Sequence, residues 1–193
     1  MGRVKEFDEE VVLDKAVKLF AVKGYNGTSA QDLVDVLGIS RSSLYDTYGD
    51  KRALFVKAVN RYREQVADQM IKFIEESDDV EVSIRHILQN VLKESMQDKM
   101  GKGCFMVNTC IEMAPHDTEV AEIVNRSMQD TEDALYHAIR KGQQAGKVSK
   151  DHSARALARF FFNTISGIRV AAKSGADKKV FDDIVTVALS TLR

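Results

Sequence analysis

Apolar positions recur three and four residues apart along nearly the whole chain, the spacing of helices that bury one face. The first such helix is expected over residues 8–23, where Asp8 is placed to start it and Gly24 to end it. No stretch alternates like a half-buried strand, and no segment repeats. Further helices are expected at 50–76, 80–97, 104–114, 117–141, 153–174 and 177–192. The pattern therefore predicts an all-α fold.

Residues 28–52 have the pattern of two short helices joined by a tight turn. Thr28 is expected to cap the first helix, and Gln31 follows three residues later, where a capping box requires it. Gly38 is free to take the left-handed conformation that ends a helix, and Ser40 is expected to cap the second helix. The apolar face of the first helix consists of Leu33, Val34, Val36 and Leu37.

The second short helix carries an unusual number of polar side chains. Its outward positions are Arg41, Ser42, Ser43, Tyr45 and Thr47, and only Leu44 is clearly inward. A core helix has no use for so many hydroxyls, whereas hydroxyl and guanidinium groups bond phosphates and base edges in the major groove of DNA. The pattern favours a helix-turn-helix that reads DNA over an ordinary helical hairpin.

Charge and composition agree with a folded DNA-binding protein but do not by themselves require one. The chain has 193 residues and a net charge of −1, so the molecule as a whole is not a polycation. Lys and Arg exceed Asp and Glu by 11 to 9 in residues 1–63, whereas residues 64–193 hold 17 against 20. The basic bias lies at the end that carries the motif.

The sequence gives no sign of a membrane segment or of secretion. No apolar run approaches the roughly 18 residues that span a bilayer, and the first residues contain no apolar signal core. The chain holds two cysteines, which suits a reducing compartment. We expect a cytoplasmic protein with no membrane partner.

Specific strings in the first 60 residues carry a family resemblance: Gly-Tyr-Asn-Gly-Thr-Ser at 24–29, Leu-Gly-Ile-Ser at 37–40, and Ser-Leu-Tyr-Asp-Thr-Tyr-Gly-Asp-Lys-Arg-Ala-Leu-Phe at 43–55. In these strings the chain resembles the TetR/AcrR family of bacterial transcriptional regulators. Further segments resemble one branch of that family, at 103–109, 114–117 and 160–175.

The resemblance implies an N-terminal three-helix helix-turn-helix DNA-binding domain and a C-terminal helical domain that binds a ligand and dimerises. The predicted boundaries are 1–52 and 53–193, with the helix over 50–76 linking the two. The helix over 153–174 is apolar on nearly every side and, together with 177–192, reads as a dimer-forming pair. An intramolecular core is the alternative for this pair.

The resemblance also implies roles for individual residues. Thr28 and Lys51 match phosphate-binding positions, Tyr48 matches an aromatic residue that packs and also contacts phosphate, and residues 40–45 match the reading helix. Asp46 departs from the family, in which many members have His or Tyr; its carboxylate either accepts a hydrogen bond from a cytosine amino group or turns toward a nearby Arg. The predicted DNA-binding set is Thr28, Ser29, Ser40, Arg41, Ser42, Ser43, Tyr45, Asp46, Thr47, Tyr48 and Lys51.

By the same resemblance, a homodimer is expected to bind a palindromic double-stranded operator, with half-sites about one turn, roughly 34 Å, or somewhat more apart. A small-molecule effector would release the dimer, and repression is the expected mode. Each predicted effector contact has plain core packing as its alternative. The candidates are Phe105, Met106, Asn108, Thr109, Met113, Phe161, Phe162 and Ile165.

Other classes of function find less support in the sequence. Cys104, close to Lys102, is a candidate redox or electrophile sensor, but a disulfide to Cys110 requires Cys104 to lie outside the helix, because six helical residues separate Cα atoms by about 9 Å. A helical scaffold without DNA binding is a second alternative. The four histidines are scattered singly, and no serine-rich stretch has a partnered His and Asp. We therefore expect no metal site, no cofactor and no enzymatic activity.

Overall fold

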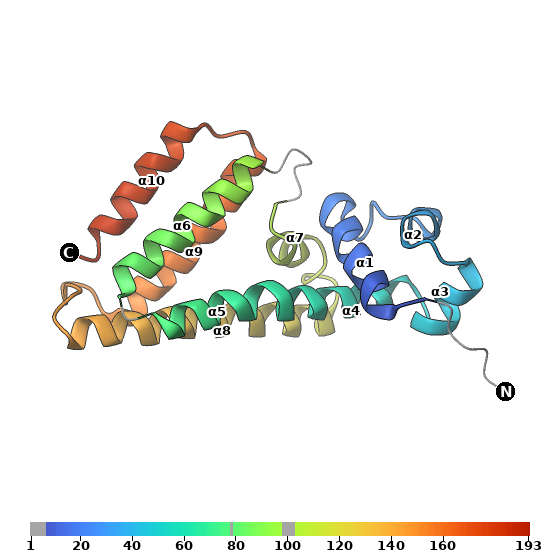
Figure 1. Ribbon diagram of the computed structural model, residues 1–193, viewed down its shortest axis with the longest axis horizontal. Helices are drawn as coiled ribbons and strands as arrows, with labels where there is room; N and C mark the ends of the chain where they lie inside the picture. Colours follow the sequence, from blue (N-terminus) through green and yellow to red (C-terminus); the bar gives the residue numbers. More distant parts are fainter. Residues whose placement is uncertain (1–6, 78, 98–102) are drawn as a thin grey trace. The chain divides into compact units, whose positions relative to one another are not determined.

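The computed structural model describes residues 7–77, 79–97 and 103–193, which form α-helices joined by turns (Figure 1). Every segment predicted as helix is helical, and the all-α class is confirmed. The elements are α1 (Glu9–Lys23), α2 (Ala30–Leu37), α3 (Arg41–Tyr48), α4 (Lys51–Tyr62), the π-helical turn η1 (Arg63–Ala67), α5 (Asp68–Glu76), α6 (Val80–Gln97), α7 (Phe105–Glu112), α8 (Thr118–Gln144), α9 (Ala154–Lys173) and α10 (Lys178–Ser190).

The helices pack into two compact units. The first consists of the described parts of Met1–Gln65 together with Cys104–Val124, and the second of the described parts of Val66–Gly103 together with Asn125–Arg193. Residues 104–124 thus pack with the N-terminal helices, although they lie far along the chain. The boundary predicted at residue 52 separates a DNA-binding part from an effector-binding part, whereas these two units are defined by packing alone. The predicted boundary therefore stays a prediction.

The local signals for helix ends are mostly confirmed. The Asp8 carboxylate accepts hydrogen bonds from two amides in the first turn of α1. Gly38 ends α2 in the left-handed conformation, with φ 72° and ψ 28°. The Ser40 hydroxyl accepts from the Ser43 amide at the start of α3, and Asp50 caps α4 through the Ala53 amide.

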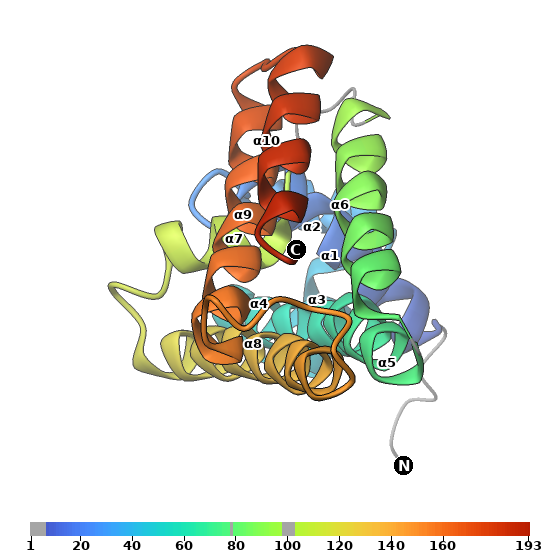
Figure 2. The same cartoon turned by 90° about the vertical axis from the view of Figure 1, so that its left-hand side faces the viewer.

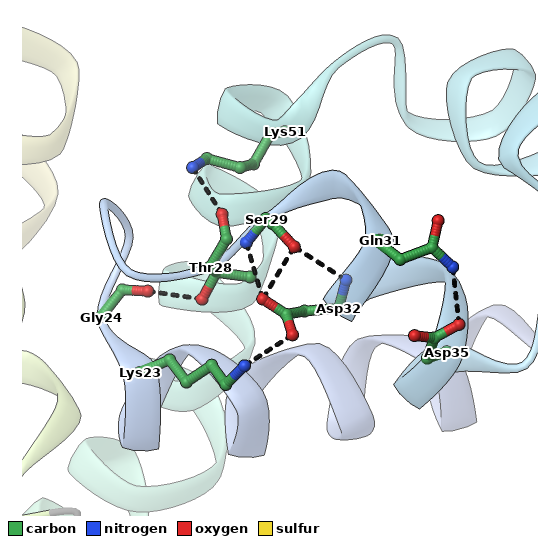
Figure 3. A network of polar contacts seen from close by, with 8 residues as sticks. All are labelled: Lys23, Gly24, Thr28, Ser29, Gln31, Asp32, Asp35 and Lys51. Carbon is green, nitrogen blue, oxygen red and sulfur yellow. Dashed lines mark hydrogen bonds and ion pairs between the residues drawn. The ribbon is translucent and has the colours of Figure 1, made fainter.

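The predicted cap of α2 is wrong by one residue. The Ser29 hydroxyl accepts from the Asp32 amide at 3.0 Å, and the Asp32 carboxylate accepts from the Ser29 amide at 2.9 Å, so the capping box joins these two (Figure 3). Thr28 instead donates its hydroxyl hydrogen to the Gly24 carbonyl. Gln31, expected in the box, donates to Asp35 one turn further along the helix.

Aromatic rings join three helices of the first unit. The Phe55 ring of α4 meets Phe20 of α1 and Tyr25 edge-on, with ring centroids 5.0 Å apart in each pair. Phe105 of α7 contacts Phe55 at 5.7 Å and Tyr62 at 5.5 Å. Because Phe105 is buried in this cluster, α7 shares one core with the helices that carry the helix-turn-helix.

In the second unit, α6, α9 and α10 lie side by side (Figure 2). The buried face of α9 includes Leu157, Phe161 and Ile165, as its apolar pattern predicts. Apolar side chains away from this buried face are exposed. Val170 of α9 is 50 % exposed, and Val187 of the neighbouring α10 is 63 % exposed. The unit therefore leaves apolar side chains of this helix pair uncovered.

A close contact at Gly142 of α8 yields a stability prediction. A Cβ at this position would lie 2.7 Å from Cγ1 of Val80 and 2.8 Å from Cγ2 of Val148. Replacing glycine by alanine inside a helix ordinarily stabilises a protein by about 0.5–1 kcal/mol, but overpacking costs about 1–3 kcal/mol. We expect Gly142→Ala to lower the free energy of unfolding in urea. Gln144→Ala, at an exposed position of the same helix, is the control; a gain in stability for Gly142→Ala would contradict the packing.

Candidate nucleic-acid interface

The α3 helix presents a polar face to solvent. Arg41, Ser42, Tyr45 and Asp46 are exposed, whereas Leu44 is buried. This is the orientation expected from the sequence, with two differences. Ser43 and Thr47 are half-buried, and Tyr48 is also turned inward, so Leu44 is not the only inward residue.

Three serine hydroxyls gather at the N-terminal end of α3. The Ser40 hydroxyl lies 2.9 Å from that of Ser42 and 2.8 Å from that of Ser43, while it also caps the helix. The start of a helix carries a partial positive charge and amides without helical partners, which favours phosphate. This end of α3 therefore combines hydroxyl donors with the electrostatic preference of a helix N-terminus.

Arg41 and Asp46 stand on the exposed face without partners. Within residues 7–77, 79–97 and 103–193, neither side chain forms a hydrogen bond or an ion pair. Of the two roles left open for Asp46, the turn toward an arginine is not observed in the protein without DNA. Both charged groups remain free to meet polar groups of another molecule.

Thr28, Ser29 and Lys51 form hydrogen bonds with other groups of the protein. The Lys51 ammonium donates to the carbonyls of Tyr25 and Thr28, each at 2.8 Å, and lies 4.3 Å from the centroid of the Tyr25 ring. Thr28 is 1 % exposed, and Ser29 caps α2 (Figure 3). These side chains hold the loop between α1 and α2, and their phosphate contacts stay predictions.

Tyr48 packs inside the first unit. Its side chain is 4 % exposed, and its hydroxyl has no hydrogen-bond partner among the described residues. Burial, together with the nearby Glu9 charge, raises the pKa of Tyr48 to about 12. The packing part of its predicted role is observed; a phosphate contact stays a prediction and would require the hydroxyl to become accessible.

Two ion-paired or hydrogen-bonded clusters at the helix-turn-helix were not foreseen from the sequence. The Glu112 carboxylate accepts hydrogen bonds from the amides of Tyr25 and Asn26 at 2.9 and 2.8 Å. Arg52, at the start of α4, donates to Asp117 at 2.6 and 2.9 Å and also to Glu119. Hydrogen bonding to Arg52 lowers the pKa of Asp117. The local pattern could not reveal this pair, because Arg52 and Asp117 lie 65 residues apart in the chain.

The predicted effector residues fall into two groups. Phe105, Met106, Thr109 and Met113 are buried in the first unit, where Asn108 is half-buried. The remaining three belong to α9 in the second unit, where Phe161 and Ile165 are buried and Phe162 is half-buried. The Thr109 hydroxyl is enclosed without a hydrogen-bond partner among the described residues. An effector site formed by these residues stays a prediction.

A cavity of about 470 Å³ in the second unit involves none of the predicted effector residues. It lies among α5, α6 and α8. Its lining includes Ile74, Val80, Ala134, His137, Lys141 and Lys147.

Both cysteines are free thiols. Cys104 occupies the N-cap position of α7, just outside the helix, and its sulfur lies 3.6 Å from the Tyr62 hydroxyl. Lys102, the cation proposed to activate Cys104, lies outside the described residues. Cysteine sensing therefore stays a prediction.

The model of the bacterial regulatory proteins of the tetR family matches residues 12–58, and the model of the tetracyclin repressor-like C-terminal domain matches residues 82–188. The chain belongs to the TetR family. It is a helix-turn-helix transcriptional regulator, as the resemblance in the sequence implied.

This TetR-family regulator is similar along its whole length to other helix-turn-helix transcriptional regulators. It is 39 % identical over 193 residues to the HTH-type transcriptional regulator YezE of Bacillus subtilis, covering 100 % of both chains. It is 29 % identical over 194 residues to the HTH-type transcriptional repressor ComR of Escherichia coli, covering 100 % of this chain and 90 % of ComR.

Among solved structures, the fold of this regulator matches that of a cysteine mutant of the TetR-family regulator CifR, solved with 26-base-pair operator DNA. The match has a TM-score of 0.86 and 23 % identity, and it covers 100 % of both chains. No helix in the described part of the regulator combines the length and the apolar composition needed to cross a bilayer.

The enclosed Tyr48 hydroxyl gives a prediction for this regulator. A buried hydroxyl without a partner is destabilising, so we expect Tyr48→Phe to raise the free energy of unfolding by about 1 kcal/mol at neutral pH. Because the pKa of Tyr48 in the folded protein, about 12, lies above its ordinary value of 10.0, ionisation of Tyr48 makes the wild type lose stability as the pH rises from 10 to 12. The variant should lack this loss.

Urea denaturation at pH 7 and between pH 10 and 12 measures the effect, and DNA affinity is measured on the same samples. We expect the Tyr48→Phe variant to bind DNA as tightly as the wild type, because a hydroxyl that is buried in the packing does not contact DNA. A large loss of affinity together with unchanged stability would show that the hydroxyl contacts phosphate and would contradict the packing role.

Proposed function

We propose that this protein is a cytoplasmic repressor that binds a palindromic operator as a homodimer and is released by a small molecule. The observation that carries the proposal is the exposed face of α3, where Arg41 and Asp46 have no partner in the described part of the protein. The operator DNA bound by CifR and the repressor name of ComR support the mode of action.

The α3 helix would lie in the major groove with its N-terminal turn toward the bases. Arg41 has the planar donor pair that recognises the O6 and N7 atoms of guanine, and the Asp46 carboxylate can accept from the amino group of cytosine. The hydroxyls of Ser42 and Ser43 would contact phosphate and fix the orientation. Sequence selectivity would therefore come mainly from two oppositely charged side chains.

Exposed apolar side chains on α9 and α10 support the homodimer. Phe160, Val170 and Val187 are between 40 and 63 % exposed, and they lie on the helix pair that the sequence predicts to dimerise. Covering such side chains with a second copy removes apolar surface from water. A twofold axis then gives two reading helices for the two halves of a palindrome.

Release by a small molecule would require two states of the dimer with different affinity for the effector. A tenfold shift between them needs about 1.4 kcal/mol of differential binding. The α7 helix is the proposed receiver, since it carries four of the predicted effector residues: Phe105, Met106, Asn108 and Thr109. The Thr109 hydroxyl, which has no partner among the described residues, would gain one from a polar ligand.

Arg41→Ala tests the reading face. The change should weaken binding to the preferred duplex by about tenfold or more, because a bidentate base contact supplies about 1–3 kcal/mol of discrimination. Affinity for random-sequence DNA should change little. Fluorescence anisotropy with DNA from upstream of the gene measures both. Arg126→Ala, which removes an exposed arginine of α8, is the charge-matched control; equal losses for the two variants would place the reading surface elsewhere.

A double variant, Val170→Arg with Val187→Arg, tests the dimer. Two charges on the proposed interface should convert the dimer to a monomer in analytical ultracentrifugation and abolish selective binding to the palindrome. Val82→Arg, at an equally exposed position of α6, should leave the dimer intact. A double variant that remains dimeric would show that α9 and α10 do not form the interface.

A further inference from the structure

Glu112, the last residue of α7, binds the loop that leads into the helix-turn-helix. Its Oε2 atom accepts from the Tyr25 amide at 2.9 Å, and its Oε1 atom accepts from the Asn26 amide at 2.8 Å. The two amides are consecutive, so both carboxylate oxygens are used on one short stretch of backbone. Hydrogen bonds to an ionised acceptor are stronger than those between neutral groups.

The loop is shaped to admit this carboxylate. A Cβ at residue 24 would lie 2.7 Å from Oε2 of Glu112 and 3.1 Å from Oε1, so a side chain there would displace the carboxylate. Gly24 also has φ 72°, a conformation that other residues rarely adopt. Glycine at this position thus leaves space for the Glu112 carboxylate and also adopts the backbone conformation that the loop has here.

Lys51 of α4 holds the same loop through its carbonyls. The Lys51 ammonium bonds the carbonyls of Tyr25 and Thr28, and the Tyr25 ring packs against Phe55. The loop ends at Ser29, which caps α2. Because α7 and α4 fix the loop, they also fix where α2 begins and, through the short turn at Gly38, where α3 points.

We propose that Glu112 is a positioning residue for DNA recognition, acting through the loop of residues 24–28. This inference rests on the proposed function. A displacement of α7 must either break both hydrogen bonds of Glu112 or carry the loop with it. Since α7 also carries Phe105, Met106 and Thr109, the helix predicted to receive the effector is the one that sets the reading helices.

Glu112→Gln tests the inference with little change of shape. A glutamine oxygen can accept from one amide, but its NH2 group then faces the other amide, which loses its acceptor. We expect affinity for the upstream duplex to fall by about tenfold, the loss of a charged hydrogen bond. Amide hydrogen exchange at Tyr25 and Asn26 should accelerate. Glu122→Gln, the same change at an exposed carboxylate of α8, should alter neither.

The ratio of affinities for the upstream duplex and for random-sequence DNA of equal length separates positioning from general destabilisation. A positioning role lowers this ratio in folded protein. Faster exchange at Tyr25 and Asn26 with an unchanged ratio would overturn the inference. If Glu112→Gln fails to fold, Glu112→Asp, which keeps the charge on a shorter side chain, should lower the ratio in the same direction, and an unchanged ratio there would overturn it equally.

The wild type distinguishes failure of this inference from failure of the proposed function. A wild-type protein without selective binding would overturn both. Selective wild-type binding with an unaltered Glu112→Gln variant would overturn the inference alone.

Discussion

The backbone of Tyr25 is held between opposite charges, and the arrangement of the first unit depends on that contact. The Glu112 carboxylate accepts a hydrogen bond from the Tyr25 amide, and the Lys51 ammonium donates one to the Tyr25 carbonyl. These bonds join the end of α7 and the start of α4 to the loop between α1 and α2. A charge-assisted hydrogen bond on each side of Tyr25 holds this loop, which leads into the helix-turn-helix that presents the outward face of α3.

Short-range rules explain why so much of the fold could be predicted. Helical periodicity and capping depend on residues within about four positions, and Gly38, Ser40 and Asp50 ended or began helices where expected. The error at α2 shows the limit of such rules. Thr28 and Ser29 are equally good caps on local grounds; the box forms at Ser29 because Asp32 accepts from its amide and is itself fixed by Lys23, nine residues away.

The supports of the candidate site could not be predicted, because their partners are distant in the chain. Glu112 lies 87 residues from Tyr25, and Asp117 lies 65 residues from Arg52. No periodic pattern marks such pairs. The outward polar residues of α3 were predictable from their contrast with Leu44. By contrast, the family resemblance assigned Lys51 and Thr28 to phosphate, and without DNA both are engaged within the protein.

We propose that α3 reads duplex DNA as one of two identical heads. Selection of binding sites from a random duplex library tests it most directly, since it assumes no operator. We expect enrichment of an inverted repeat whose half-sites lie about one helical turn or somewhat more apart. Failure to enrich any sequence, or enrichment of a motif without twofold symmetry, would contradict it.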